Sequence, residues 1–101
     1  MYIISPTARR EIAECGLYVF HETGSLEGWE RWMDKLLTTF RLLEQSPRMG
    51  KPRPELRRRL RSHPCEDHTV FYRIKADGVE ISRVVHHRRD LKKAFPRRKR
   101  S

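Results

Sequence analysis

Hydrophobic residues recur with a helical period through the first half of the chain. Tyr2–Ile4 is a short β-prone run, and Ser5-Pro6 follows it with residues that favour a helix start, since Ser caps an amide and Pro has none to satisfy. Apolar residues then mark one helix up to residues 23–25 and a second from about Leu26 to Gln45: Ala8, Ile12, Cys15 and Val19, then Trp29, Met33, Leu36, Leu37, Phe40 and Leu43. The short connection predicts an antiparallel helical hairpin.

The second half of the chain has the pattern of short strands. Residues 46–54 contain three prolines and a glycine, which predicts an irregular loop. We expect a strand over residues 57–62, ended by His63-Pro64. Two further strands, over residues 68–75 and 79–87, flank the hairpin turn Ala76-Asp77-Gly78. Residues 91–95 are expected to form a short helical turn before Pro96.

Strand alternation assigns apolar residues to both faces of the expected hairpin. Val70, Tyr72 and Ile74 should share one face, with Phe71 on the other. On the second strand, Val79, Ile81 and Val85 should share a face and Val84 should oppose them. One face can pack on the helices, and the other then needs cover from the chain's own tail or from a partner.

These elements predict an α+β fold with an N-terminal strand and a helical hairpin packed on a small, mostly antiparallel sheet. A chain of 101 residues is expected to form one domain, here residues 1–95, followed by a basic tail over residues 96–101.

The net excess of positive charge lies entirely in the second half of the chain. Residues 1–47 contain 5 Lys and Arg against 7 Asp and Glu, whereas residues 48–101 contain 18 against 6. A field of this kind attracts polyanions or acidic protein surfaces and accelerates encounter with them.

The remaining composition argues against several protein classes. Cys15 and Cys65 form no CxxC pair, which fits a reducing cytosol, and neither a signal peptide nor a membrane span is expected. Cys65, His63, His68 and His86 match no closed zinc-site spacing, so no metal is predicted, and no cofactor motif is present.

A cluster of Arg and His near the last strand suggests possible chemistry. A metal-independent ribonuclease needs a base for the 2′-hydroxyl, an acid for the leaving oxygen and cations on the phosphate. The candidates are Arg61, Arg73, Arg83, His86, His87, Arg88 and Arg89. The alternative interpretation is that Arg83 pairs with an internal acid and that the others form a solvated or partner-binding face.

Several motifs along the chain resemble the ParE/RelE toxins of bacterial toxin–antitoxin pairs, and ParE most closely. The matching segments are Ser5-Pro6-x-Ala8, Gly24-Ser25, Leu43-x-x-x-Pro47-x-x-Gly50-x-x-Arg53-x-Glu55-Leu56, Leu60-Arg61-Ser62, His68-x-x-Phe71-Tyr72-Arg73 and Val79-Glu80-Ile81-x-Arg83-Val84-x-His86-x-Arg88-x-Asp90. The resemblance covers nearly the whole chain.

This resemblance implies a cytoplasmic toxin that inhibits DNA gyrase by binding and forms a hetero-oligomer with a small ParD-like antitoxin. An amphipathic, acid-rich antitoxin segment is expected to contact Leu60, Arg61, Phe71, Arg73, Val84 and Arg89. The alternative is a RelE-like, ribosome-dependent mRNA endoribonuclease using Arg61, Arg83, His86, His87 and Arg88. RelE-like nucleases usually carry a Tyr or His after the last strand, where this chain has Phe95, which favours ParE.

Overall fold

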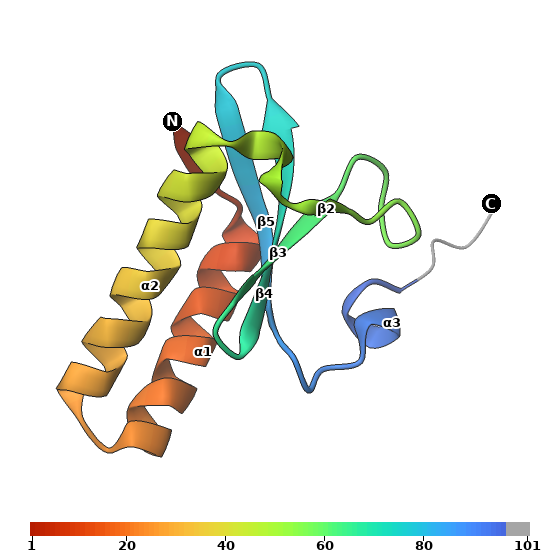
Figure 1. The fold of residues 1–101 in the computed structure, drawn as a ribbon. Coiled ribbons are helices and arrows are strands. Elements are labelled where there is room, and N and C mark those ends of the chain that lie inside the picture. Colours follow the sequence, from red (N-terminus) through yellow and green to blue (C-terminus); the bar gives the residue numbers. More distant parts are fainter. Residues whose placement is uncertain (97–101) are drawn as a thin grey trace.

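In the computed structural model, which describes residues 1–96, two helices cover one face of a five-stranded sheet (Figure 1). The helices are α1 (Pro6–Thr23) and α2 (Leu26–Gln45), and the α+β prediction is confirmed. The expected basic tail falls on residues 97–101, outside the described part, apart from Pro96. No helix within residues 1–96 is long and apolar enough to cross a membrane.

The helical hairpin begins and ends at the residues expected from sequence. Ser5 Oγ accepts the Ala8 amide at 3.0 Å, with Pro6 as the first helical residue of α1. Gly24, at φ 64°, ends α1 by donating its amide to the Phe20 carbonyl, and Ser25 caps α2. Gly16 lets the two helices approach closely, because a Cβ there would lie 2.8 Å from Trp29 Nε1.

The sheet has the strand order β1-β5-β4-β3-β2, and only the β1–β5 pair is parallel. Its strands are β1 (Tyr2–Ile4), β2 (Lys51–Pro52), β3 (Arg61–Cys65), β4 (His68–Lys75) and β5 (Gly78–His86). A 3₁₀ turn, η1 (Pro47–Met49), joins α2 to β2.

The strand expected over residues 57–62 is wrong, because β3 begins only at Arg61. Residues 54–59 form turns, and Arg59 has a left-handed φ of 59° that a strand cannot contain. Pro64 does not end the strand, since β2 pairs only with Arg61 and Ser62 and leaves the outer edge of β3 open beyond them.

The predicted face of Val84 and Val85 is also wrong, because β5 contains a β-bulge. Phe71 pairs with Arg83 while Tyr72 pairs with Ile81, so Ser82 has no opposing residue. The extra residue shifts the alternation by one. Val84 therefore packs in the helix-side core, and Val85 packs with Phe71 on the other face.

The chain covers its second sheet face itself. After β5, Asp90 caps the short helix α3 (Leu91–Ala94) by accepting the Lys92 amide at 2.9 Å. Phe95 then packs edge-on against Phe71, with ring centroids 4.7 Å apart. This second core contains Leu60, Phe71, Val85, Ala94 and Phe95, flanked by Leu56 and Leu91.

Candidate functional site

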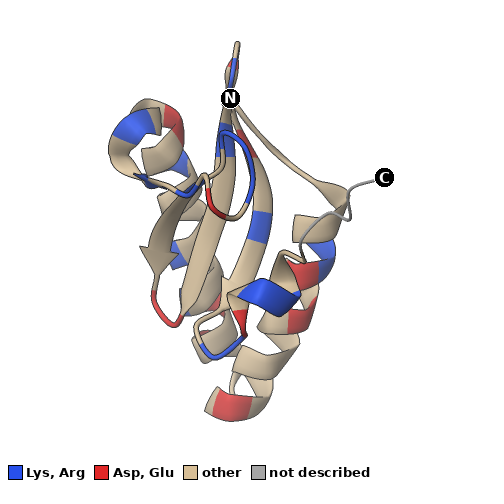
Figure 2. Ribbon diagram, turned by 90° about the vertical axis from the view of Figure 1, so that its right-hand side faces the viewer, with Lys and Arg blue, Asp and Glu red and all other residues tan. Residues whose placement is uncertain are grey.

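Beside the second core lies a basic surface that we name the arginine cleft, formed by Arg57, Arg58, Arg59 and Arg73. It consists of two adjoining hollows of about 190 and 370 Å³ that share Arg73. Figure 2 shows Lys and Arg on the strands, loops and α3, whereas on the two long helices Lys and Arg are mixed with Asp and Glu. In the part of the chain that the structure describes, none of the four guanidinium groups pairs with a carboxylate.

The apolar residues expected to meet a partner are buried within the chain. Leu60 is 1% exposed and Phe71 0%, beneath α3 and Phe95, and Val84 is buried against the helices on the opposite face. Of the two kinds of cover expected for the second sheet face, the chain's own tail or a partner, α3 and Phe95 supply the first for Leu60 and Phe71, and contact of these residues with a partner stays a prediction.

Arg83 is engaged inside the protein. Its guanidinium donates to both carboxylate oxygens of Glu11 at 2.7–3.0 Å, and Nη1 donates to the Ala94 carbonyl at 2.5 Å. Glu11 also accepts the Val84 amide at 3.0 Å, and Arg89 Nη1 lies 3.6 Å from the same carboxylate. The interpretation that Arg83 pairs with an internal acid is confirmed, and Arg83 links α1, β5 and α3.

Arg61 and Arg73 also hold the backbone in place. Arg61 donates to the carbonyls of Gly50 and Arg48 at 3.1 Å, which fixes the loop before β2. Arg73 donates to Ser82 Oγ at the bulge and, at 3.4 Å, to the Arg58 carbonyl. Of the two, only Arg73 lines the arginine cleft.

The histidines lie elsewhere, at the far end of β5. His86 pairs with His68 on β4, and His68 pairs in turn with Cys65 on β3. Arg61 lies four residues before Cys65 on β3, which places it about 13 Å along the strand from that end of the sheet. The structure therefore brings His86, His87 and Arg88 together but does not bring Arg61 or Arg83 to them. The five residues considered for a nuclease do not converge on one site in this conformation.

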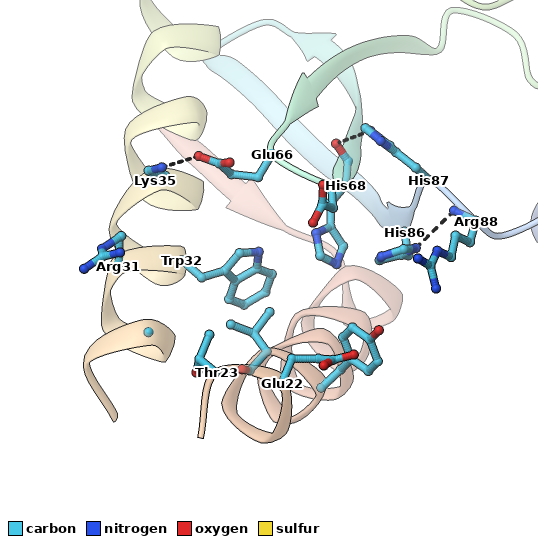
Figure 3. A pocket seen from close by; sticks show the side chains of 14 residues that line it. Glu22, Thr23, Arg31, Trp32, Lys35, Glu66, His68, His86, His87 and Arg88 are labelled. Atoms are coloured by element: carbon cyan, nitrogen blue, oxygen red, sulfur yellow. Dashed lines mark hydrogen bonds and ion pairs between the residues drawn. The ribbon is translucent and has the colours of Figure 1, made fainter. Parts of the chain in front are cut away.

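His86, His87 and Arg88 instead line an open pocket of about 580 Å³, which we name the histidine pocket (Figure 3). Trp32 and Tyr18 enter it from the two helices, and His68 enters from β4. No motif or residue spacing around Trp32 predicted a pocket. The backbone of this region is held by His87 Nε2, 3.1 Å from the His68 carbonyl, and by the Arg88 amide donating to His86 Nδ1 at 3.0 Å.

His68 is the most unusual group in the histidine pocket. It is 3% exposed, and its ring lies between those of Trp32 and His86, at centroid distances of 5.4 and 5.0 Å. Burial, and to a smaller extent the nearby His86, together lower the pKa of His68 to about 4, while Asp67 opposes the shift. The ring is therefore neutral at physiological pH.

Residues 1–96 contain no group of three or more His, Cys, Asp or Glu side chains arranged to hold a metal ion. The thiol of Cys65, which was weighed as a ligand, instead accepts a hydrogen bond from Thr39 Oγ1 at 3.3 Å beneath the sheet. Burial raises the pKa of the Cys65 thiol.

The fold resembles that of a protein whose structure has been solved. A solved structure of the chromosomal ParDE TA system from P. aeruginosa superposes with a TM-score of 0.71, over 84% of this chain and 92% of the matched chain, at 16% identity. The fold is therefore that of a protein from a toxin–antitoxin system.

Sequence comparison identifies the family. The model of the ParE toxin of the type II toxin–antitoxin system parDE matches residues 2–91. Toxin ParE1 of Mycobacterium tuberculosis, from strains CDC 1551 / Oshkosh and ATCC 25618 / H37Rv, is 28% identical over 91 residues, covering 89% of this chain and 92% of the relative. The chain belongs to the ParE toxin family of type II toxin–antitoxin systems.

Proposed function

We propose that this ParE toxin acts by binding DNA gyrase and that a cognate ParD-like antitoxin neutralises it in a hetero-oligomer. Membership of the parDE family supports a toxin with a paired antitoxin. Gyrase as the target comes from the resemblance to ParE proteins. One observation favours binding over RNA cleavage. Arg61 and Arg83 form hydrogen bonds within the protein, so the histidines lack these two cations for binding a phosphate.

The arginine cleft is the surface that we propose for the antitoxin. Arg57 stacks over the ring of Phe95 at 5.6 Å, and Arg73 lines the same hollow as Phe95. An acid-rich, amphipathic segment complements such a surface, with carboxylates on the arginines and apolar side chains along the edge of α3. Of the arginines expected from the sequence to contact a partner, Arg73 belongs to this surface, whereas Arg89, whose side chain is half exposed, lies beside Glu11 of α1.

Gyrase binding is tested with purified toxin in a DNA supercoiling assay, alongside a ribosome-dependent mRNA cleavage assay. The double variant H86Q/H87Q distinguishes the two activities, because a general base contributes about 10²- to 10⁴-fold in rate. We expect the wild-type toxin and H86Q/H87Q to inhibit supercoiling equally, and neither to cleave mRNA. Ribosome-dependent cleavage that the double variant loses, with an unchanged melting temperature, would instead establish the RelE-like endoribonuclease.

The antitoxin surface is tested by charge reversal in the cleft. The variant R58E/R59E should slow association with the cognate antitoxin by at least about 10-fold at low salt, with a weaker salt dependence. R10E/R41E is the matched control, since it changes the net charge equally at exposed positions on the two helices. Equal slowing by both variants would show that total charge, not the arginine cleft, controls association.

A further inference from the structure

The floor of the histidine pocket contains buried polar atoms that the protein does not satisfy. Trp32 Nε1 and both ring nitrogens of His68 are buried and have no hydrogen-bond partner among residues 1–96. Trp32 is 5% exposed and His68 3%, and both line the pocket. Buried polar groups in native proteins are nearly always paired, because desolvation without a partner is costly. Three such atoms in one pocket indicate a place built for a hydrogen-bonding group.

The chemistry of the floor defines that group. An indole donates only, and a neutral imidazole offers one donor and one acceptor. His68 stays neutral because burial holds its pKa at about 4. The two rings are neighbours, with centroids 5.4 Å apart. The floor therefore offers two donors and one acceptor and carries no charge.

The rim of the histidine pocket has no excess charge of either sign. Three cations and three carboxylates line it, and one of each, Lys35 and Glu66, form an ion pair (Figure 3). The charged lining residues are Arg31, Lys35, Arg88, Glu22, Glu66 and Asp67. A phosphate or a carboxylate gains no net attraction here, and burying its charge on a neutral floor is costly. These features favour a neutral polar occupant over a nucleotide.

We propose that the histidine pocket binds the carboxamide of an Asn or Gln side chain presented by a protein partner. The amide oxygen would accept from Trp32 Nε1 and the amide nitrogen would donate to the free acceptor nitrogen of His68. A carboxamide is planar, uncharged, and carries both an acceptor and donors. The pocket volume of about 580 Å³ exceeds that of one amide, which fits a polypeptide segment entering with its flanking residues. Tyr18 and His86, whose rings meet edge-on at 5.8 Å, form an aromatic wall for that segment.

The test is a titration of ¹⁵N-labelled protein followed by NMR through the indole N–H signals of its two tryptophans. The probes are N-acetyl-glutamine-N-methylamide, its glutamate counterpart and adenosine monophosphate. We expect the glutamine probe to shift the Trp32 indole signal saturably, the glutamate probe and the nucleotide to bind at least about 10-fold more weakly, and Trp29 to be unaffected. No shift of the Trp32 signal by the glutamine probe, or equal or tighter binding of either anionic probe, would overturn the proposal.

Two matched variants assign the effect to Trp32 itself. W32F removes the indole N–H but keeps an aromatic ring, and should weaken the glutamine probe by about 2- to 12-fold, as expected for one neutral hydrogen bond. In that protein, binding is followed through the backbone amides of His68 and His86. W29F makes the same change one turn away on α2, outside the pocket lining, and should leave affinity unchanged. Equal effects of the two variants would contradict the assignment. Neither measurement involves gyrase or antitoxin, so failure of this proposal can be distinguished from failure of the proposed function.

Discussion

The buried, neutral His68 predicts an acid-sensitive fold. Its pKa is about 6.5 in the unfolded chain and about 4 in the folded protein, so the unfolded state binds more protons between these values. The free energy of unfolding must therefore fall as pH drops below 6.5, and the loss is complete near pH 4. Between pH 7 and pH 5 the contribution of His68 amounts to about 2 kcal/mol. The groups facing it are His86 and His87, which also disfavour its protonation, and Asp67, which opposes them.

The assay is urea denaturation at several pH values between 7 and 5, comparing wild type with H68F. Phe fills the same space between the Trp32 and His86 rings and cannot take a proton. The stability of H68F should decline about 2 kcal/mol less than that of wild type over this interval. H21F is the control, because His21 is exposed on α1, and it should follow the wild-type curve. Parallel curves for wild type and H68F would refute the reasoning.

Further predictions concern the packing around α3 and are measured by urea denaturation. E11Q should destabilise the protein by about 3 kcal/mol, because it leaves the guanidinium of Arg83 buried without its counter-charge. The exposed control E14Q should change stability by less than about 0.5 kcal/mol. F95A should cost about 3 kcal/mol, since Phe95 is 7% exposed, whereas deletion of residues 97–101, which contain no apolar residue, should cost less than about 0.5 kcal/mol. Equal losses from F95A and the deletion would contradict the prediction that the tail lies outside the core.

Local signals predicted the helical half of this fold well. Ser5-Pro6, Gly24-Ser25 and the apolar stripes are properties of neighbouring residues, and helix boundaries depend on such neighbours. The hairpin turn at Gly78 was predictable for the same reason. The β-bulge at Ser82 was not, because it arises from pairing with β4 and from contacts of Ser82 with Ser5 and Arg73, which are distant in sequence.

The site was harder to predict than the fold. The sequence grouped Arg83 with His86 because they lie three residues apart, but Arg83 turns toward Glu11, which precedes it by 72 residues. No sequence pattern linked Trp32 to His68, because their contact depends on how α2 packs against the end of β4. The excess of arginine in the second half did predict a basic surface. Charged side chains are costly to bury, so most of them lie on the surface of the elements that carry them.

The parallel pairing of β1 with β5 has a consequence for how the toxin is made. Tyr2–Ile4 pairs with Val79–Ile81, and the Ser5 amide donates to the Ile81 carbonyl at 2.9 Å, so the first strand depends on one of the last segments to be synthesised. Contacts so distant in sequence form late, because the intervening chain must be ordered first. During translation the helical hairpin can form early, but the sheet cannot be completed until β5 has emerged. A ribosome making this protein therefore holds a nascent chain whose sheet stays unfinished until residues 78–86 have emerged.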